Sequence, residues 1–183
     1  MSIRLFFMLV LARSFSMSTQ AQDCDRSCLA GFLNQYLDAI VANDASQAPL
    51  SYGFRQTENS IVVPNDEGLW STVDALGALQ RRYYDPIGMT AGFFGLMEES
   101  GELAVVALRL KISNRQISEA EWHIGREDDV GLTGNPGGVL FDSDNLIANP
   151  PLEGFVPLDR RSNRDDLIAI ANGDAPGETP SKP

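Results

Sequence analysis

Three β-rich runs between Met89 and Arg126 constrain the fold of this chain more than any other feature. The runs MTAGFFGLMEE, LAVVALRLKIS and QISEAEWHIGR favour strands, because β-branched and aromatic residues are frequent in them. Ser100-Gly101 separates the first two runs and suits a two-residue hairpin turn. A loop through residues 114–116 precedes the third run, so the pattern predicts three consecutive antiparallel strands.

The apolar residues also predict the register of these strands, because a slip of one residue would invert every side chain. Placing Glu99 opposite Glu102 makes one face of the hairpin entirely apolar. On that face the predicted partners are Met97 with Ala104, Gly95 with Val106, Phe93 with Leu108, Ala91 with Leu110, Leu110 with Ala120, Leu108 with Trp122 and Val106 with Ile124. On the other face they are Arg109 with Glu121, Lys111 with Glu119 and Ala107 with His123, so that opposite charges meet.

A helix is predicted before these strands. Its apolar stripe comprises Leu29, Phe32, Leu33, Tyr36, Leu37, Ile40 and Val41. Asp23 or Asp25 suits its N-cap, and Asn43-Asp44 marks its end. Residues 51–59 and 60–63 are expected to be short extended pieces, and residues 65–79, NDEGLWSTVDALGAL, a short helix.

The region after Arg126 changes in character. Residues 127–159 are rich in Gly, Pro, Asn and Asp, which is typical of an irregular segment. Residues 162–173, SNRDDLIAIANG, predict a short helix with Gly173 at its left-handed C-cap. Residues 174–183 are expected to be a disordered tail.

The first 21 residues have the order of a secretory signal peptide. Arg4 precedes an apolar run from Leu5 to Ala12, and small residues lead to a predicted cut after Ala21. The run is too short to span a bilayer. We therefore expect a protein that is secreted or held in a secretory compartment.

Charge limits the partners of the chain. The 14 basic and 25 acidic residues give a formal charge of −11. Removing residues 1–21 takes away two arginines and no acid, which leaves 12 − 25 = −13. We therefore expect no nucleic-acid partner and no membrane association after signal cleavage.

Both cysteines, Cys24 and Cys28, lie in CDRSC. The oxidising secretory route permits a local disulfide between them, and its tiny loop predicts little added stability. A redox-active pair or a metal site is the alternative. The spacing is not C-x-x-C, and one histidine cannot complete a zinc shell, so no metal is expected. Serine hydrolase, zincin and nucleotide-binding motifs are also absent from the sequence, and no cofactor is expected.

Five segments together resemble a known family. DCDRSCL, TENS, EGLW, GFFGLMEESGELAVVALRLKI and ISEAEWHIGR are similar to segments of fungal secreted proteins of uncharacterised function, related to nuclear transport factor 2 (NTF2), ketosteroid isomerase and the SnoaL cyclases. The resemblance covers about Asp23 to Arg126. It implies an α+β, NTF2-like cone in which N-terminal helices pack on a curved antiparallel sheet. The expected organisation is signal peptide 1–21, NTF2-like domain 22–126, irregular wrap and short helix 127–173, and tail 174–183.

The resemblance also implies two alternative functions. One is a cofactor-independent enzyme of fungal secondary metabolism that isomerises or cyclises a small apolar metabolite by acid–base chemistry. Signal-peptide-bearing proteins of this architecture occur in fungal maleidride clusters, which suggests a dimerising cyclase by analogy of fold. The other alternative is a non-catalytic secreted binding protein.

Candidate catalytic residues surround the single histidine of the chain. His123 would act as acid or base, with Glu121 raising its pKa and Arg109 holding the carboxylate. The alternative is a surface or interface role, because apolar residues near His123 on the outer sheet face would suit a homodimer.

Candidate substrate-binding residues are expected on the inner side of the sheet. They are Tyr36, Trp70, Tyr84 and Asp85, with Glu58 as a further inward candidate. For each of them the alternative is packing or turn chemistry: Trp70 suits a core anchor and Asp85-Pro86 the start of a turn.

Overall fold

The computed structural model of the chain describes residues 24–126, 129, 142–151, 153–154 and 156–173. The predicted signal peptide, much of the expected irregular wrap and the predicted tail lie outside these residues and stay predictions. The chain divides into two compact units, Met1–Asn149 and Pro150–Pro183. None of the described helices is long and apolar enough to cross a membrane.

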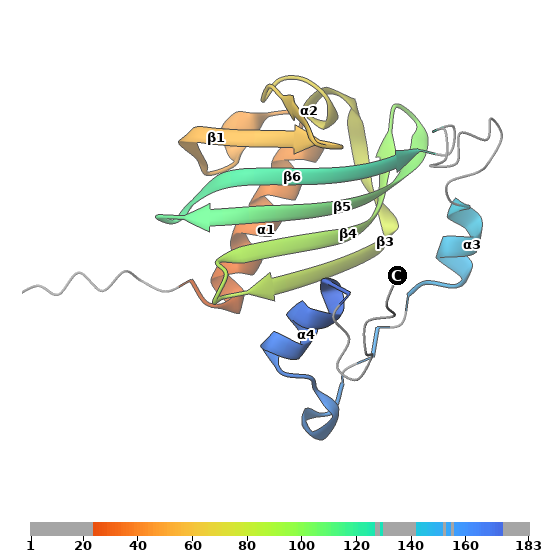
Figure 1. Ribbon diagram of the computed structural model, residues 1–183. Coiled ribbons are helices and arrows are strands. Elements are labelled where there is room, and N and C mark those ends of the chain that lie inside the picture. Colours follow the sequence, from red (N-terminus) through yellow and green to blue (C-terminus); the bar gives the residue numbers. More distant parts are fainter. Residues whose placement is uncertain (1–23, 127–128, 130–141, 152, 155, 174–183) are drawn as a thin grey trace, which may run out of the picture. The chain divides into compact units, whose positions relative to one another are not determined.

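The first unit is an α+β fold built on a six-stranded mixed sheet (Figure 1). Its elements are α1 (Arg26–Val41), the short 3-10 helix η1 (Ala45–Gln47), β1 (Leu50–Glu58), β2 (Ile61–Val63), α2 (Leu69–Thr72), β3 (Val73–Asp85), β4 (Thr90–Glu99), β5 (Glu102–Ser113), β6 (Gln116–Arg126) and α3 (Ser143–Ala148). The strand order is β2-β1-β6-β5-β4-β3. All neighbours are antiparallel except β1 and β6, which run parallel, so the expectation of a wholly antiparallel sheet is wrong at that pair.

The β4–β5–β6 meander confirms the predicted registers. Every predicted partner pair of the two faces is observed. Ser100 and Gly101 both have positive φ, 53° and 85°, as a two-residue hairpin turn of this kind requires. The second turn is shorter than predicted, because Gln116 already pairs with Ser113. An irregularity between Lys111 and Ile112 then shifts the pairing by one residue, so that Lys111 still pairs with Glu119.

The helix predicted over residues 65–79 is largely wrong. Only Leu69–Thr72 is helical, and Val73 begins β3, a strand of 13 residues along the edge of the sheet. Two irregularities interrupt its pairing with β4, one between Val73 and Ala75 and one between Leu76 and Gln80. They shift the apolar residues away from strict alternation, so that their spacing in sequence resembles that of a helix.

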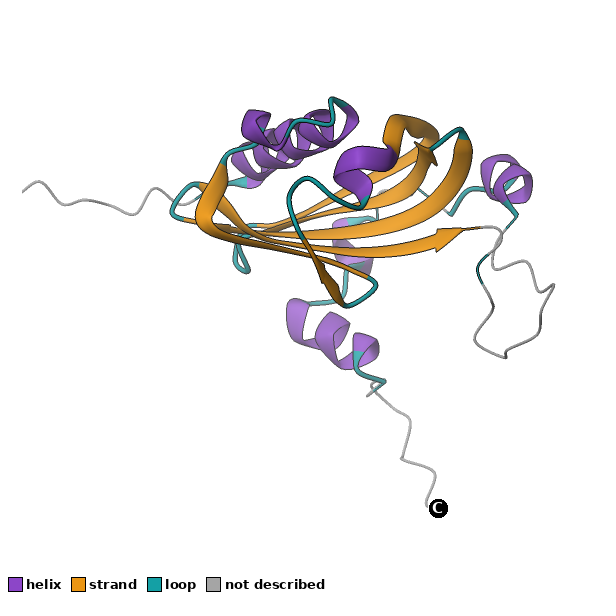
Figure 2. Cartoon of the chain, turned by 90° about the horizontal axis from the view of Figure 1, so that it is seen from above, coloured by secondary structure: helices purple, strands orange, loops and turns teal. Residues whose placement is uncertain are grey.

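The core lies between α1 and one face of the curved sheet, with α2 on the same face (Figure 2). Asp25 caps α1 by accepting a hydrogen bond from the Cys28 backbone N–H at 2.9 Å. The predicted apolar stripe faces the sheet, and Leu29, Leu33, Leu37 and Ile40 are buried. Full burial of such a side chain contributes roughly 1.5–3 kcal/mol relative to exposure, so this stripe fixes the inner face of the sheet.

The two cysteines form a disulfide at the start of α1, with a Cα–Cα distance of 5.2 Å. Cys24 is buried in the core cluster.

The region after Arg126 contains more helix than expected. Residues 143–148, placed in the irregular wrap, form α3, with Asp142 as N-cap. The second unit contains the 3-10 helix η2 (Leu158–Arg160) and α4 (Arg164–Ala171). Helix α4 confirms the predicted short helix, and Gly173 follows it with a left-handed φ of 83°.

Candidate functional site

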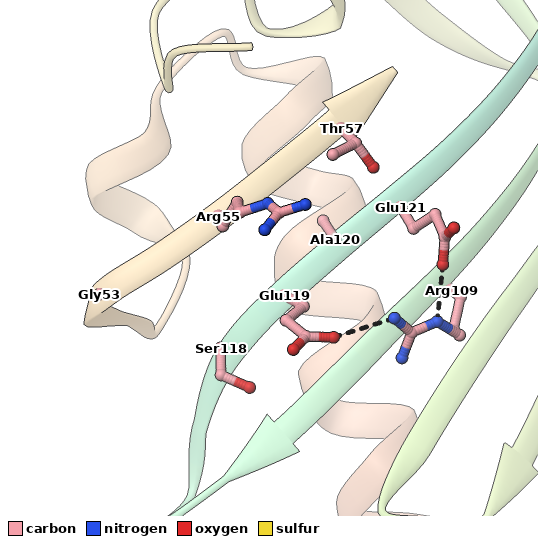
Figure 3. A pocket seen from close by; sticks show the side chains of 8 residues that line it. All are labelled: Gly53, Arg55, Thr57, Arg109, Ser118, Glu119, Ala120 and Glu121. Carbon is pink, nitrogen blue, oxygen red and sulfur yellow. Dashed lines mark hydrogen bonds and ion pairs between the residues drawn. The ribbon is translucent and has the colours of Figure 1, made fainter. Parts of the chain in front are cut away.

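A groove of about 380 Å³ opens on the outer face of the sheet, opposite α1 (Figure 3). Strands β1 and β6 form its walls and β5 contributes one side chain. Its lining residues are Gly53, Arg55, Thr57, Arg109, Ser118, Glu119, Ala120 and Glu121. Two of the predicted catalytic residues, Arg109 and Glu121, therefore lie in the same depression.

The groove results from an irregular pairing of β1 with β6. Leu50 pairs with Ile117 and Arg55 pairs with Glu119, so five steps along β1 match two steps along β6. The excess residues of β1, 51–54, therefore have no register partner in β6. Gly53 lies within this stretch and adds no side chain to it.

An ion triad occupies one side of the groove. The guanidinium of Arg109 donates from Nε to Glu121 Oε2 and from a terminal nitrogen to Glu119 Oε2, both at 2.9 Å. The hydrogen bond from Arg109 lowers the pKa of Glu121, and the nearby charge of His123 acts in the same direction. The same two carboxylates raise the pKa of Arg109. Glu121 is therefore a stable carboxylate, which makes it a poor general base near neutral pH.

The predicted ion pair of Lys111 with Glu119 is wrong, although their register is right. Lys111 Nζ donates to the backbone carbonyl of Gly88 at 2.7 Å, and Glu119 bonds Arg109 instead. A long lysine side chain turns easily toward a carbonyl at the strand end, and exposed pairs of this kind contribute little stability.

The β1 wall carries two polar groups that have no partner in the described part of the chain. Among the described residues, neither the Arg55 guanidinium nor the Thr57 hydroxyl has a hydrogen-bond or ion-pair partner. Both side chains project from the same face of β1 beside the triad (Figure 3). The groove therefore contains one cation that is not neutralised within the described part of the chain.

His123 lies beside Ala107, as the register predicts, and is exposed. It follows Glu121 on the same face of β6 but does not line the groove. On the same sheet face, Leu96 pairs with Val105; Leu96 is buried within the single chain, and Val105 is half-buried. A homodimer through this face stays a prediction.

The inner candidates Tyr36 and Trp70 lie together in the core. Their ring centroids are 5.3 Å apart, and both rings contact the buried side chain of Gln56. The Tyr36 hydroxyl donates to Gln56 Oε1 at 2.6 Å, and Trp70 Nε1 donates to the same oxygen at 2.8 Å. Trp122 Nε1 in turn donates to the Tyr36 hydroxyl at 3.2 Å.

This buried network leaves no room for a substrate at Tyr36. Tyr36 and Trp122 have no accessible surface, so no water-sized space adjoins either ring. Burial raises the pKa of Tyr36; the hydrogen bond from Trp122 opposes the shift, and the charge of Glu58 adds to it. Tyr36 is thus a permanent donor within a packed core.

The other two inner candidates lie elsewhere. Tyr84 packs against the core at the end of β3, and Asp85 opens the turn that leads to β4. The Asp85 carboxylate accepts the backbone N–H of Ile87 at 3.1 Å. These contacts match the packing and turn alternatives for the two residues.

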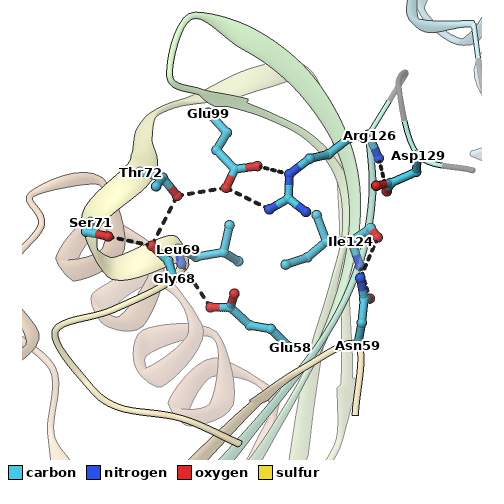
Figure 4. Close-up of polar contacts among 10 residues, drawn as sticks. All are labelled: Glu58, Asn59, Gly68, Leu69, Ser71, Thr72, Glu99, Ile124, Arg126 and Asp129. Carbon is cyan, nitrogen blue, oxygen red and sulfur yellow. Dashed lines mark hydrogen bonds and ion pairs between the residues drawn. The ribbon is translucent and has the colours of Figure 1, made fainter. Parts of the chain in front are cut away.

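A second polar cluster joins α2 to the ends of β1, β4 and β6 (Figure 4). Arg126 donates twice to Glu99, at 2.7 and 2.8 Å, and the Thr72 hydroxyl donates to Glu99 at 2.8 Å. Burial alone would raise the pKa of Glu99, but the hydrogen bonds from Arg126 and Thr72 and the charge of Arg126 outweigh it and lower the pKa.

Glu58 and Asn59 make the hydrogen bonds on the other side of this cluster. Glu58 Oε1 accepts the backbone N–H of Leu69 at 2.9 Å and also a bond from Gln56. The Asn59 side chain exchanges two hydrogen bonds with the backbone of Ile124, at 2.8 and 3.0 Å. Residues 57–60, 67–70, 97–100 and 123–126 thus come together in this cluster through side-chain hydrogen bonds.

Sequence reasoning missed Gln56, Arg55 and the pair of Glu99 with Arg126. The predicted registers contained a signal for the pair: Met97, Ala104 and Arg126 lie in one row, with Glu99 two residues beyond Met97 on the same face. Because the side chain of Ala104 is small, the Arg126 side chain can extend over it to Glu99. Gln56 gave no comparable signal, because the two aromatic side chains that donate to it come from α1 and α2.

Known proteins add little to this geometry. No family model matches the chain, and no curated protein matches it. Among solved structures, the chain is similar to an NTF2-like protein of unknown function from Cytophaga hutchinsonii ATCC 33406, known from a crystal structure. The match has 9% sequence identity and a TM-score of 0.43, and it covers 52% of this chain and 88% of the other. Within the described residues, no group of three or more His, Cys, Asp or Glu side chains could hold a metal ion.

Proposed function

We propose that the first unit is a small-molecule-binding domain of NTF2-like type whose binding site is the outer groove between β1 and β6. The observation that carries the proposal is the unpartnered Arg55 guanidinium beside a depression of about 380 Å³. That volume falls within the range of ordinary ligand sites. An exposed cation with no internal role is a group that a ligand can engage without breaking the fold.

The packing of the inner face supports binding over catalysis. The isomerase alternative needs titratable groups around a space that holds substrate and excludes water. Tyr36 and Trp70 instead bond to Gln56 inside the core, and Glu121 is held as an ionised partner of Arg109. The acid–base isomerase or cyclase, the apolar metabolite and the secretory location stay predictions.

The experiment is a fragment screen on the purified full chain, monitored by amide chemical shifts. A groove ligand should shift the signals of residues 53–57 and 118–121 and saturate. Thr57→Trp fills the groove and should abolish these shifts. Ile61→Trp, at an exposed position on β2 outside the groove, should leave them unchanged. Ligands that shift core signals and survive Thr57→Trp would overturn the proposal.

A further inference from the structure

The wall formed by β1 offers a carboxylate-binding side chain. Arg55 is the cross-strand neighbour of Glu119, yet the Glu119 carboxylate bonds Arg109. The Arg55 guanidinium therefore keeps its N–H donors available, and their planar arrangement matches both oxygens of a carboxylate. The unbonded hydroxyl of Thr57, two residues along the same face, adds a further donor.

The opposite wall offers acceptors. Glu119 and Glu121 each use Oε2 to bond Arg109. The other carboxylate oxygen of each has no partner among the described residues. A carboxylate holds about four acceptor positions, so both side chains retain capacity for an ammonium group.

The charges that line the groove limit the class of ligand it can bind. Two arginines and two glutamates line the groove, so its formal charge is zero, while the chain as a whole carries −11. The negative charge of the whole chain would repel a simple anion, and the positive charge of Arg55 would repel a simple cation. The lining contains no aromatic ring and no apolar side chain larger than Ala120, so it offers little contact to an apolar metabolite.

We infer that the groove binds a small zwitterion of the amino-acid or dipeptide class. Arg55 and Thr57 bind its carboxylate, and the free oxygens of Glu119 and Glu121 bind its ammonium group. This inference rests on the proposed function, because it names the ligand class of the same groove.

The test is calorimetric titration of the full chain with three matched probes. Alanylalanine carries both charges, N-acetylalanine only the carboxylate, and alaninamide only the ammonium group. We expect saturable binding of alanylalanine and at least roughly tenfold weaker binding of the other two, since each lacks a charge-assisted contact.

Variants then assign the binding to the groove. Arg55→Ala should weaken alanylalanine binding by about tenfold or more, and Arg55→Lys by less, because lysine keeps the charge but loses the fork. Arg115→Ala, an exposed arginine in the turn between β5 and β6, should change nothing. Arg55 is exposed, so thermal melting should show that both Arg55 variants fold.

Other outcomes would overturn the inference. Equal binding of N-acetylalanine and alanylalanine would indicate a plain anion site. Failure of all three probes, with a different fragment still shifting the groove signals, would reject the zwitterion and leave the binding function standing. Failure of all three probes together with an empty fragment screen would reject both.

Discussion

Tyr36 in α1 and Gln56 in β1 share a 2.6 Å hydrogen bond inside the core, across 20 positions of sequence. Gln56 is the one polar or charged side chain that is fully buried among the described residues. Its oxygen accepts from Tyr36 and Trp70, and its amide nitrogen donates to Glu58. The glutamine thus joins the helix, the strand and α2 by hydrogen bonds rather than by apolar contact.

Gln56→Leu should lower the free energy of unfolding by about 2–4 kcal/mol, because it leaves two buried donors, the Tyr36 hydroxyl and Trp70 Nε1, without an acceptor and removes one of the hydrogen bonds of Glu58. Urea denaturation followed by tryptophan fluorescence measures the change. The control is Gln35→Leu at an exposed site on α1, which should change the free energy of unfolding by less than about 0.5 kcal/mol. Equal stability of Gln56→Leu and the unchanged chain would show that the network contributes nothing.

Glu99→Gln should make stability less dependent on pH. The folded-state pKa of Glu99 lies below its ordinary value of 4.5, so its ion pair stabilises the fold above that pH and is lost as pH falls through the lower folded value. We expect a loss of about 1–2 kcal/mol at neutral pH, at the low end for a charged pair because Arg126 is 39% exposed.

Urea denaturation at several pH values checks this. The gap between Glu99→Gln and the unchanged chain should narrow below pH 4.5. Glu98→Gln, on the exposed neighbouring residue, is the control. A gap that stays constant from neutral to acid pH would contradict the assignment.

Gly68→Ala should destabilise the fold by about 1–3 kcal/mol. Gly68 has φ of 60°, and a Cβ there would approach the Glu58 carboxylate. Gly101→Ala is the control that separates backbone strain from the contact with Glu58. Gly101 also has a positive φ, 85°, but a Cβ there would meet no neighbouring atom within 4 Å. Thermal melting of both variants measures the difference. If Gly101→Ala costs as much as Gly68→Ala, backbone strain alone explains both losses.

Arg109→Met should cost less than about 1 kcal/mol, because its ion pairs with Glu119 and Glu121 join side chains 42–53% exposed. The change should nevertheless raise the pKa of Glu121 toward its ordinary value of 4.5, since the hydrogen bond from Arg109 is what lowers it. Carboxyl chemical shifts recorded against pH measure this. An unmoved Glu121 titration would mean that another group holds the carboxylate.

Local patterns predicted the meander between β4 and β6 because each strand there alternates regularly and each turn is short. The first seven residues of β3, 73–79, were mistaken for part of a helix for the opposite reason. Its irregular pairing at Val73 and between Leu76 and Gln80 breaks the alternation on which the prediction depends. Bulges depend on the neighbouring strand, which a single run of residues does not reveal.

The candidate site was predicted only in part. The pair of Arg109 with Glu121 followed from the register and is confirmed. The parallel pairing of β1 with β6, which creates the groove beside that pair, joins residues far apart in sequence. Arg55 therefore gave no sign of its position next to Glu119. Gln56, which the sequence did not single out, accepts hydrogen bonds from two of the inner candidates, Tyr36 and Trp70, and this matches the packing alternative for them.

The parallel union of β1 with β6 also has a consequence for synthesis on the ribosome. Gln116 bonds Leu50 across 66 positions, so β1 emerges long before its main neighbour exists. Until β6 appears, the three residues of β2 are the strand pairing that β1 has within the sheet. Closing so long a loop is entropically costly, and an unpaired strand edge invites pairing with other chains. A nascent chain halted before Gln116 therefore carries two open edges, on β1 and β5, and the arrival of β6 closes both at once.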